Sequence, residues 1–118
     1  MGRSVVIVDD HVGFRRGASE LLGAAGFEVV ACCPDGRSAL DTIVALRPDI
    51  VLLDVQLPDI DGFAVIERLA LTEPPAIVLV SSREAADYGG RVATSGAVGF
   101  ITKADLSAAS LADVVAGR

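Results

Sequence analysis

The stretch VVIVDDHVGF, residues 5–14, decides the fold of this chain. Four apolar residues, 5–8, run directly into two adjacent aspartates, Asp9 and Asp10. A short continuous apolar run is typical of a strand that is covered on both faces, as the strands of a parallel sheet are. Two neighbouring carboxylates at the end of such a strand repel each other and lose hydration, so something must hold them there.

Apolar runs and helical stripes alternate along the rest of the chain. The predicted strands are residues 4–8, 27–32, 49–53, 76–80 and 97–101. Apolar residues at helical spacing predict helices within 14–25, 39–46, 63–70, 84–95 and 107–116. The pattern predicts an α/β fold, (βα)5, with a doubly wound parallel five-stranded sheet in which residues 1–118 form one domain.

Short polar signals mark where the helices should begin. Asp35 and Asp61 each stand directly before a glycine at the start of a predicted helix. Aspartate is a preferred N-terminal cap because its side chain accepts a hydrogen bond from a free backbone N–H group. One aspartate of the opening pair is expected to cap the first helix in the same way.

Composition narrows the function classes. The chain is 52% hydrophobic with a mean hydropathy of +0.55, which excludes a disordered protein. Its net charge of −6 argues against direct nucleic-acid contact by this domain, because phosphate binding needs a basic face. No apolar run reaches the ~18 residues that span a membrane, and the start lacks a signal-peptide pattern, so a cytoplasmic location is expected. Cys32 and Cys33 are adjacent and are expected to be buried free thiols.

Polar residues follow the predicted strands at the points where these end. Ligands of open α/β sheets bind outside the carboxyl ends of the strands, so these side chains should converge. They are Asp9, Asp10, Asp54, Ser81 and Lys103. Two carboxylates ~4 Å apart repel by about 4 kcal/mol at an effective dielectric constant near 20, so three stay ionised only beside a cation or with raised pKa values.

The residue types of this set indicate phosphoryl chemistry. Oxygen ligands without a supporting histidine favour Mg²⁺ over Zn²⁺, and the one histidine, His11, is expected to be a structural or surface residue beside the site. Lys103 is the only lysine, whereas the other nine basic residues are arginine, which suggests that a compact ammonium is needed there. The implied reaction is phosphoryl transfer onto a carboxylate, which gives an aspartyl phosphate.

The ordered set of strand-end residues resembles the response-regulator receiver domain of bacterial two-component systems. The resemblance covers essentially the whole chain and rests on the aspartate pair, LLDVQLPDIDG around Asp54, Ser81, Phe100 and Lys103. It implies a flavodoxin-like sheet with strand order 2-1-3-4-5. The stretch DDHVGFRRG is similar to the subfamily whose receivers precede a LuxR-type helix-turn-helix domain.

The resemblance also implies a metal shell. Asp54 corresponds to the phosphoacceptor, Asp10 to a direct Mg²⁺ ligand and Asp9 to a ligand that acts mainly through water. The backbone carbonyl of Gln56 would complete the protein's share of the ligands.

The same resemblance implies the switch. Lys103 would hold the phosphoryl group, Ser81 would be drawn toward it, and Phe100 would turn inward when Ser81 moves. A histidine kinase would donate the phosphoryl group. The signal would leave through the fourth helix, fifth strand and fifth helix, to a homodimer partner or to an output domain from which this chain is expected to have been separated.

Two residues depart from the family pattern, Ala104 and Ser82, the latter because a smaller residue usually follows the switch hydroxyl. Ala104 stands where the family often has a proline in a cis bond, so the Lys103–Ala104 bond is expected to be either trans with a re-routed loop or a strained cis bond. Gly89 and Gly90 lie inside the predicted fourth helix, which should therefore be the least stable helix. These departures leave open a receiver-like interaction module that works without phosphorylation. A haloacid-dehalogenase-type phosphohydrolase is disfavoured, because Asp54-Val55-Gln56 lacks the second acid of a D-x-D motif.

Overall fold

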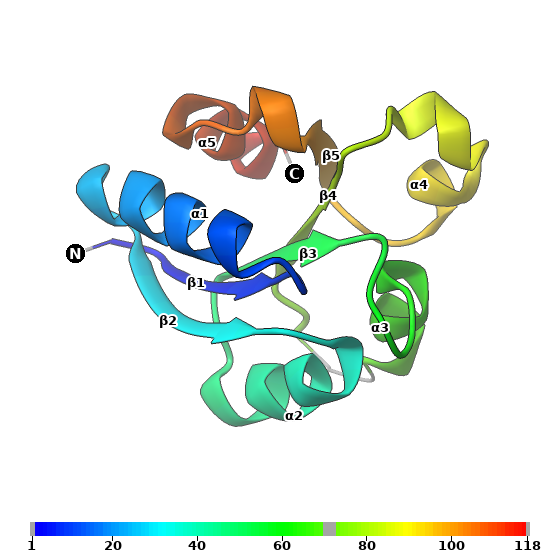
Figure 1. The fold of residues 1–118 in the computed structure, drawn as a ribbon, viewed down its shortest axis with the longest axis horizontal. Coiled ribbons are helices and arrows are strands. Elements are labelled where there is room, and N and C mark those ends of the chain that lie inside the picture. Colours follow the sequence, from blue (N-terminus) through cyan, green and yellow to red (C-terminus); the bar gives the residue numbers. More distant parts are fainter. Residues whose placement is uncertain (1, 70–72, 118) are drawn as a thin grey trace.

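The computed structural model describes residues 2–69 and 73–117 and contains one parallel five-stranded sheet. Its strand order is β2-β1-β3-β4-β5, which confirms the predicted fold class (Figure 1). The strands are β1 (Ser4–Val8), β2 (Glu28–Cys33), β3 (Ile50–Asp54), β4 (Ala76–Ser81) and β5 (Gly99–Thr102). The predicted bounds of four strands differ from these by one or two residues, and Asp54 and Ser81 are the last residues of their strands.

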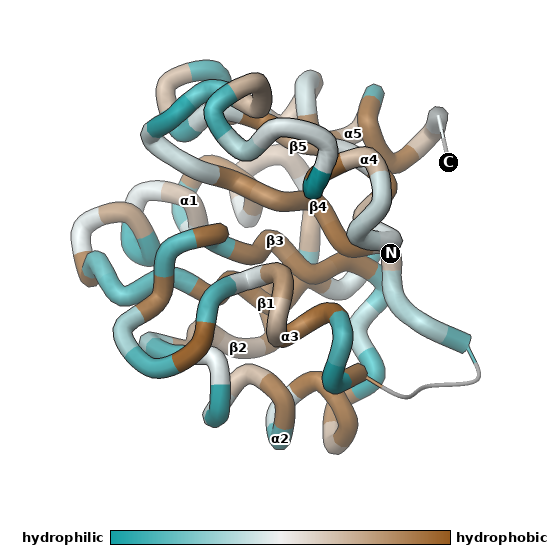
Figure 2. The backbone as a smooth tube through the Cα atoms, turned by 90° about the vertical axis from the view of Figure 1, so that its right-hand side faces the viewer, coloured by the Kyte–Doolittle hydropathy of each residue, from teal (hydrophilic) through white to brown (hydrophobic). Residues whose placement is uncertain are grey.

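Helices cover both faces of the sheet (Figure 1). On one face lie α1 (Val12–Ala24) and α5 (Ala108–Ala116), and on the other lie α2 (Gly36–Leu46) and α3 (Gly62–Arg68). Alternate residues of β1 serve the two cores: Ile7 packs with α1 and α5, whereas Val6 packs with α2 and α3. The three central strands, β1, β3 and β4, are almost completely buried. Figure 2 shows that hydrophobic residues predominate along these strands, in the middle of the molecule. Burial on both faces explains why these strands are continuous apolar runs.

Two of the three expected helix caps are confirmed. The Asp35 side chain accepts from the N–H of Ser38, and the Asp61 side chain accepts from the N–H of Ala64, each at 2.8 Å. The expectation that Asp9 or Asp10 caps α1 is wrong, because the N-cap residue is His11 and its side chain makes no cap bond. Asp9 is instead the last residue before the turn, where its Oδ1 atom accepts from the N–H of His11 at 2.8 Å.

The predicted helix over 84–95 is wrong in form. The segment consists of a 3-10 turn, η1 (Ala85–Tyr88), and a separate short helix, α4 (Arg91–Thr94). The helical conformation is interrupted at Gly89, whose φ of +61° and ψ of −135° are readily adopted only by glycine. At the start of η1 the N–H of Glu84 donates to the Asp87 side chain at 3.1 Å, which stabilises this turn locally. No residue of η1 or α4 is buried.

Two further expectations are resolved by the backbone. No cis peptide bond occurs among the described residues, so the Lys103–Ala104 bond is trans, and it leads into a 3-10 turn, η2 (Lys103–Asp105). Both cysteines are free, as expected, but only Cys33 is buried, and Cys32 is exposed. Burial of both was a wrong expectation, because β2 is an edge strand whose alternate side chains face outward. None of the helices in the described ranges is long and apolar enough to cross a membrane.

Candidate functional site

The carboxyl edge of the sheet gathers the polar residues that end the central strands. Asp9 follows β1, Asp54 ends β3 and Ser81 ends β4, and their exposed fractions are 0%, 3% and 1%. Lys103 follows β5 at the same edge. The start of α3 packs directly against the end of β3. Only glycine fits at Gly62, because a Cβ atom there would lie 2.6 Å from the carbonyl oxygen of Asp54. The site is therefore built on rigid strand ends and closed on one side by the start of α3.

Lys103 bridges the two buried carboxylates. Its Nζ atom lies 2.6 Å from Asp9 Oδ2 and 3.3 Å from Asp54 Oδ2. The same atom lies 4.7 Å from the centre of the Phe14 ring, which adds a cation–π contact from α1. Burial lowers the pKa of Lys103, but the two carboxylates outweigh it and hold the pKa above its ordinary value. The side chain is therefore a firmly charged ammonium.

Asp54 is the carboxylate whose ionisation is most perturbed. Burial and the neighbouring charge of Asp9 raise its pKa to about 6, although donation from the Gln56 N–H group at 3.1 Å and the charge of Lys103 act in the opposite direction. One ammonium thus compensates the crowded carboxylates incompletely. Additional positive charge at this site would stabilise the ionised form of Asp54.

A metal ion fits the donor atoms. One atom each from Asp9, Asp10, His11 and Asp54 lies within 4.8 Å of all the others. Asp9 Oδ2 is buried and accepts no well-directed hydrogen bond from the described residues, and its close partner is the Lys103 ammonium. A buried carboxylate oxygen without hydrogen bonds, beside further carboxylate oxygens, suits a hard divalent cation such as Mg²⁺. Gln56, the second residue after β3, lies beside this group, since its N–H donates to Asp54 Oδ1.

His11 lies at the mouth of the acidic group. Its Nδ1 atom is 3.0 Å from Asp9 Oδ1 and 3.1 Å from Asp10 Oδ1, and its side chain is 69% exposed. It is a largely exposed residue beside the site, as expected, and it also orders the turn that carries both aspartates through its backbone N–H bond to Asp9.

Ser81 is held on its other side by a residue that sequence reasoning missed. Its Oγ atom lies 2.6 Å from the hydroxyl oxygen of Tyr88 and accepts from the N–H of Arg83 at 3.0 Å. The Tyr88 ring lies between Phe63 of α3 and Phe100 of β5, with ring centres 5.8 and 6.1 Å away. Phe100 is half-buried and packs on the same core. The single tyrosine, seven residues after Ser81, was the available signal.

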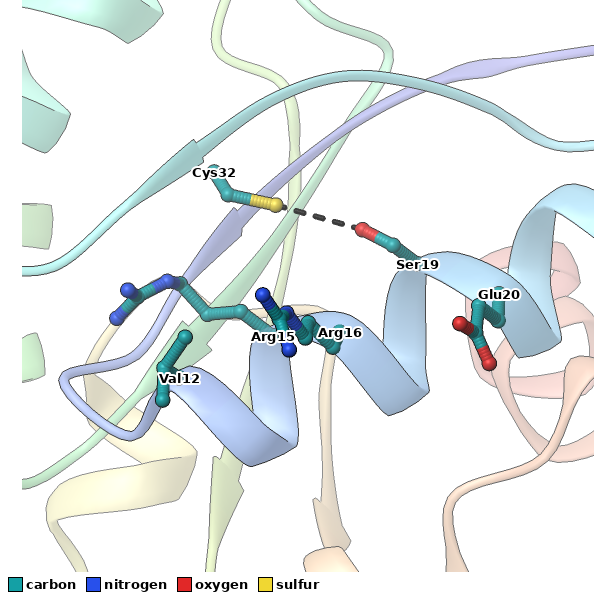
Figure 3. A pocket seen from close by; sticks show the side chains of 6 residues that line it. All are labelled: Val12, Arg15, Arg16, Ser19, Glu20 and Cys32. Atoms are coloured by element: carbon teal, nitrogen blue, oxygen red, sulfur yellow. Dashed lines mark hydrogen bonds between the residues drawn. The ribbon is translucent and has the colours of Figure 1, made fainter.

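A separate cleft of about 430 Å³ opens between α1 and the edge strand β2 (Figure 3). It contains none of the predicted site residues. Its lining side chains are Val12, Arg15, Arg16, Ser19, Glu20 and Cys32. Arg15 connects it to the site, because its guanidinium donates to the backbone carbonyl of Asp9 at 2.7 Å.

Comparison with known proteins assigns the family. Residues 5–115 match the model of the response regulator receiver domain. The chain belongs to this family. Receiver domains bind Mg²⁺ at an acidic pocket, and the acidic group of this chain occupies the corresponding edge of the sheet.

Curated relatives of this receiver domain are longer than this chain. The chain is 33% identical over 112 residues to a protein-glutamate methylesterase/protein-glutamine glutaminase of Archaeoglobus fulgidus, covering 93% of this chain and 32% of that protein. It is 36% identical over 102 residues to the Fimbriae Z protein of Salmonella typhimurium, covering 85% of this chain and 49% of that protein. The receiver chain therefore spans half or less of the length of these relatives.

Solved structures agree with the fold of the receiver. The signal receiver domain of NarL from Mycobacterium tuberculosis is 32% identical, with a TM-score of 0.87 and coverage of 99% of this chain and 98% of that chain. A LuxR-family two-component response regulator from Aurantimonas has the same TM-score at 25% identity, covering 100% and 88%. The chemotaxis response regulator CheY4 of Vibrio cholerae, at 24% identity and a TM-score of 0.83, covers 98% of each chain and shows the fold alone. The comparisons thus do not single out the LuxR subfamily.

Proposed function

We propose that this receiver is a phosphorylation-dependent switch that accepts a phosphoryl group on Asp54 from a histidine kinase. The observation that carries the proposal is the contact of Lys103 with both Asp9 and Asp54 at the carboxyl edge of the sheet. An ammonium beside a buried carboxylate is the arrangement that binds an incoming phosphoryl oxygen and stabilises its charge.

In the transfer, a carboxylate oxygen of Asp54 attacks the phosphorus of a phosphohistidine. The new O–P bond forms while the P–N bond breaks, and the electron pair of that bond remains on the departing imidazole, which takes up a proton from solvent. Asp54 must be ionised to attack, so its raised pKa makes neutralisation of the surrounding charge important. Lys103 exchanges its contact with Asp54 for one with a phosphoryl oxygen.

Mg²⁺, when bound, supplies the positive charge that keeps the carboxylates ionised and neutralises the phosphoryl oxygens. Asp10 and Asp54 would hold it directly, Asp9 mainly through water, and Gln56 through its backbone carbonyl. The hydrogen-bond-free Oδ2 atom of Asp9 supports this ligand set.

The phosphoryl group changes the face made by α4, β5 and α5. Ser81 donates its hydroxyl proton to a phosphoryl oxygen, and Phe100 responds by turning inward. The domain, residues 1–118, performs only its own phosphorylation and dephosphorylation. It controls a LuxR-type DNA-binding output domain or a second copy of itself in the cytoplasm, and makes no nucleic-acid or membrane contact of its own.

A receiver-like interaction module that works without phosphorylation is the second candidate. One observation favours it: the Ser81 hydroxyl is already engaged by Tyr88 at 2.6 Å and is not free for a phosphoryl group.

Incubation with Mg²⁺ and acetyl phosphate tests the two candidates. The native protein is expected to gain the mass of one phosphoryl group, and Asp54→Asn is expected to gain none. Asp59→Asn serves as the matched control, because Asp59 lies in the same loop but outside the acidic group. A native protein that stays unmodified under these conditions would support the second candidate.

A further inference from the structure

The Ser81 hydroxyl has a resident partner. Tyr88 reaches it from η1 with its hydroxyl oxygen 2.6 Å from Ser81 Oγ, a short contact for two hydroxyl groups. The N–H of Arg83 donates to the same Oγ atom at 3.0 Å. These two contacts fix the Ser81 side chain toward the start of the fourth helical segment.

The Tyr88 ring also contacts two other aromatic rings. Phe63 meets it edge-on, with an angle of 66° between ring planes, and Phe100 lies on another side at 6.1 Å. Phe100 and Tyr88 are therefore in ring contact, so a change at one ring alters the packing of the other. The guanidinium of Arg91, 4.2 Å above the Phe63 ring and 3.5 Å from Asp61, ties the short helix that follows to α3.

Ser81 cannot serve both partners. The conflict is one of position rather than of protons: Oγ lies 2.6 Å from the Tyr88 hydroxyl oxygen, where either group can be the donor, and it must leave Tyr88 if the side chain is to turn toward a phosphoryl group on Asp54. Tyr88 would then keep its ring among apolar neighbours but lose the partner of its hydroxyl, which is unfavourable for a partly buried polar group. The break at Gly89, directly after Tyr88, lets this turn move without unwinding a continuous helix.

We propose that Tyr88 is a positioning residue that restrains Ser81 in the unphosphorylated domain, and that its release couples Asp54 phosphorylation to the α4–β5 face. The inference rests on the proposed function, because it requires a phosphoryl group at Asp54 to compete for Ser81. The same competition makes the Tyr88 hydroxyl an inhibitor of phosphorylation.

The intrinsic fluorescence of the protein reports on the environment of Tyr88. It is the only tyrosine, and the chain has no tryptophan, so near-ultraviolet fluorescence of the native protein comes from Tyr88. Saturation with beryllofluoride and Mg²⁺, a stable substitute for the phosphoryl group, is expected to change the intensity of this emission. Asp54→Asn is expected to show no change.

The isosteric variant Tyr88→Phe tests the restraint itself. Loss of a single hydrogen bond that opposes binding should lower the half-saturating beryllofluoride concentration by about two- to tenfold, measured by amide NMR for native and variant alike. Ser82→Ala, which removes the neighbouring exposed hydroxyl, should leave it unchanged. Merely structural damage would weaken binding rather than strengthen it.

The outcomes separate the two proposals. If acetyl phosphate modifies Asp54 but Tyr88 emission stays constant and Tyr88→Phe binds beryllofluoride no more tightly than the native protein, the role of Tyr88 is refuted and the proposed function stands. If neither reagent acts on the native protein, the proposed function fails and the role of Tyr88 fails with it.

Discussion

At the scale of single residues, the site holds more buried negative charge than its one ammonium can compensate. Asp9 is fully buried and Asp54 is 3% exposed, and the one ammonium between them is shared. Removing Lys103 would leave both buried carboxylates without their ammonium, so Lys103 stabilises the fold independently of its proposed role. Such crowding of carboxylates costs stability, as is common where a site is arranged for a ligand, and it agrees with the proposed function.

Replacement of Asp54 by asparagine should stabilise the metal-free domain at neutral pH. The raised pKa, about 6 against an ordinary value of 3.8, means that folding favours the protonated acid. Its contribution is therefore fully present below pH 3.8 and is lost as the pH rises through about 6. In EDTA at pH 7.5, Asp54→Asn should melt roughly 3–6 °C above the native protein, and the two should converge near pH 4.

Mg²⁺ should reverse that order. Added Mg²⁺ should raise the melting temperature of the native protein more than that of Asp54→Asn, because only the native protein offers the third carboxylate. Thermal melts with and without Mg²⁺ measure this difference. A native protein already more stable than Asp54→Asn in EDTA at pH 7.5 would contradict the charge argument.

Asp59 provides a pH dependence of opposite sign. Its carboxylate accepts from the N–H groups of Gly36 at 2.8 Å and Arg37 at 2.9 Å, which joins the loop after β3 to the start of α2. Burial would raise its pKa, but these donations and one from Ile60 lower it to about 2. Its stabilisation is present above pH 3.8 and is lost as the pH falls through about 2.

The variant Asp59→Ala should therefore unfold at lower urea concentration than the native protein at pH 7, with the difference shrinking between pH 4 and pH 2. Asp41→Ala removes an exposed aspartate within α2 and should have little effect at either pH. Equal destabilisation by both substitutions would show that the backbone contacts of Asp59 contribute nothing.

Among the helices, the fourth segment is set apart by its two glycines, which play different parts. Gly89 has φ +61°, where a side chain is strained, whereas Gly90 has φ −82° and ψ −2°, and a Cβ atom there would meet no other atom within 4 Å. Gly90→Ala should stabilise the domain by about 0.4–1 kcal/mol, because it restricts the unfolded chain. Gly89→Ala should destabilise it by about 1–3 kcal/mol. Urea unfolding of the two variants measures both, and effects of the same sign would refute the distinction.

How far the sequence predicts each element depends on the range of the forces that shape it. β1, β3 and β4 were predictable because burial on both faces leaves a continuous apolar run, and Asp35 and Asp61 were predictable because capping is local. The strand-end carboxylates and Lys103 followed from the topology of a parallel sheet. The contact of Tyr88 with Ser81 depends on a chain break and on packing against two other elements, which no local pattern records. The exposure of Cys32 likewise depends on which strand lies at the edge.

The domain combines a well-buried part, formed by β1, β3 and β4, with a less buried corner, formed by β5, η1 and α4. β1, β3 and β4 are buried along almost their whole length, whereas β5 has one buried residue, Ile101, and the adjoining η1 and α4 have none. Few buried contacts imply a low free energy of local opening. The site lies where the two parts meet, because Asp54 ends the buried strand β3 and Lys103 directly follows β5. A ligand that bridges them can thus change the population of the corner while the rest of the fold stays constant.

Hydrogen exchange should reveal this division. Amides of residues 84–95 are expected to exchange faster than those of α1 and α3 in the unmodified domain, since no residue of η1 or α4 is itself buried. Beryllofluoride with Mg²⁺ should change exchange in 84–95 and β5 but leave α2 unaltered, and Asp54→Asn should show no response. Moving such an equilibrium from 1:99 to 99:1 requires about 5.5 kcal/mol of differential binding, so a partial change in exchange would measure how much of this the phosphoryl site supplies. Protection of 84–95 equal to that of α1 and α3 would mean that the corner is as rigid as the rest, and signalling would then have to proceed by a rigid shift of the whole face.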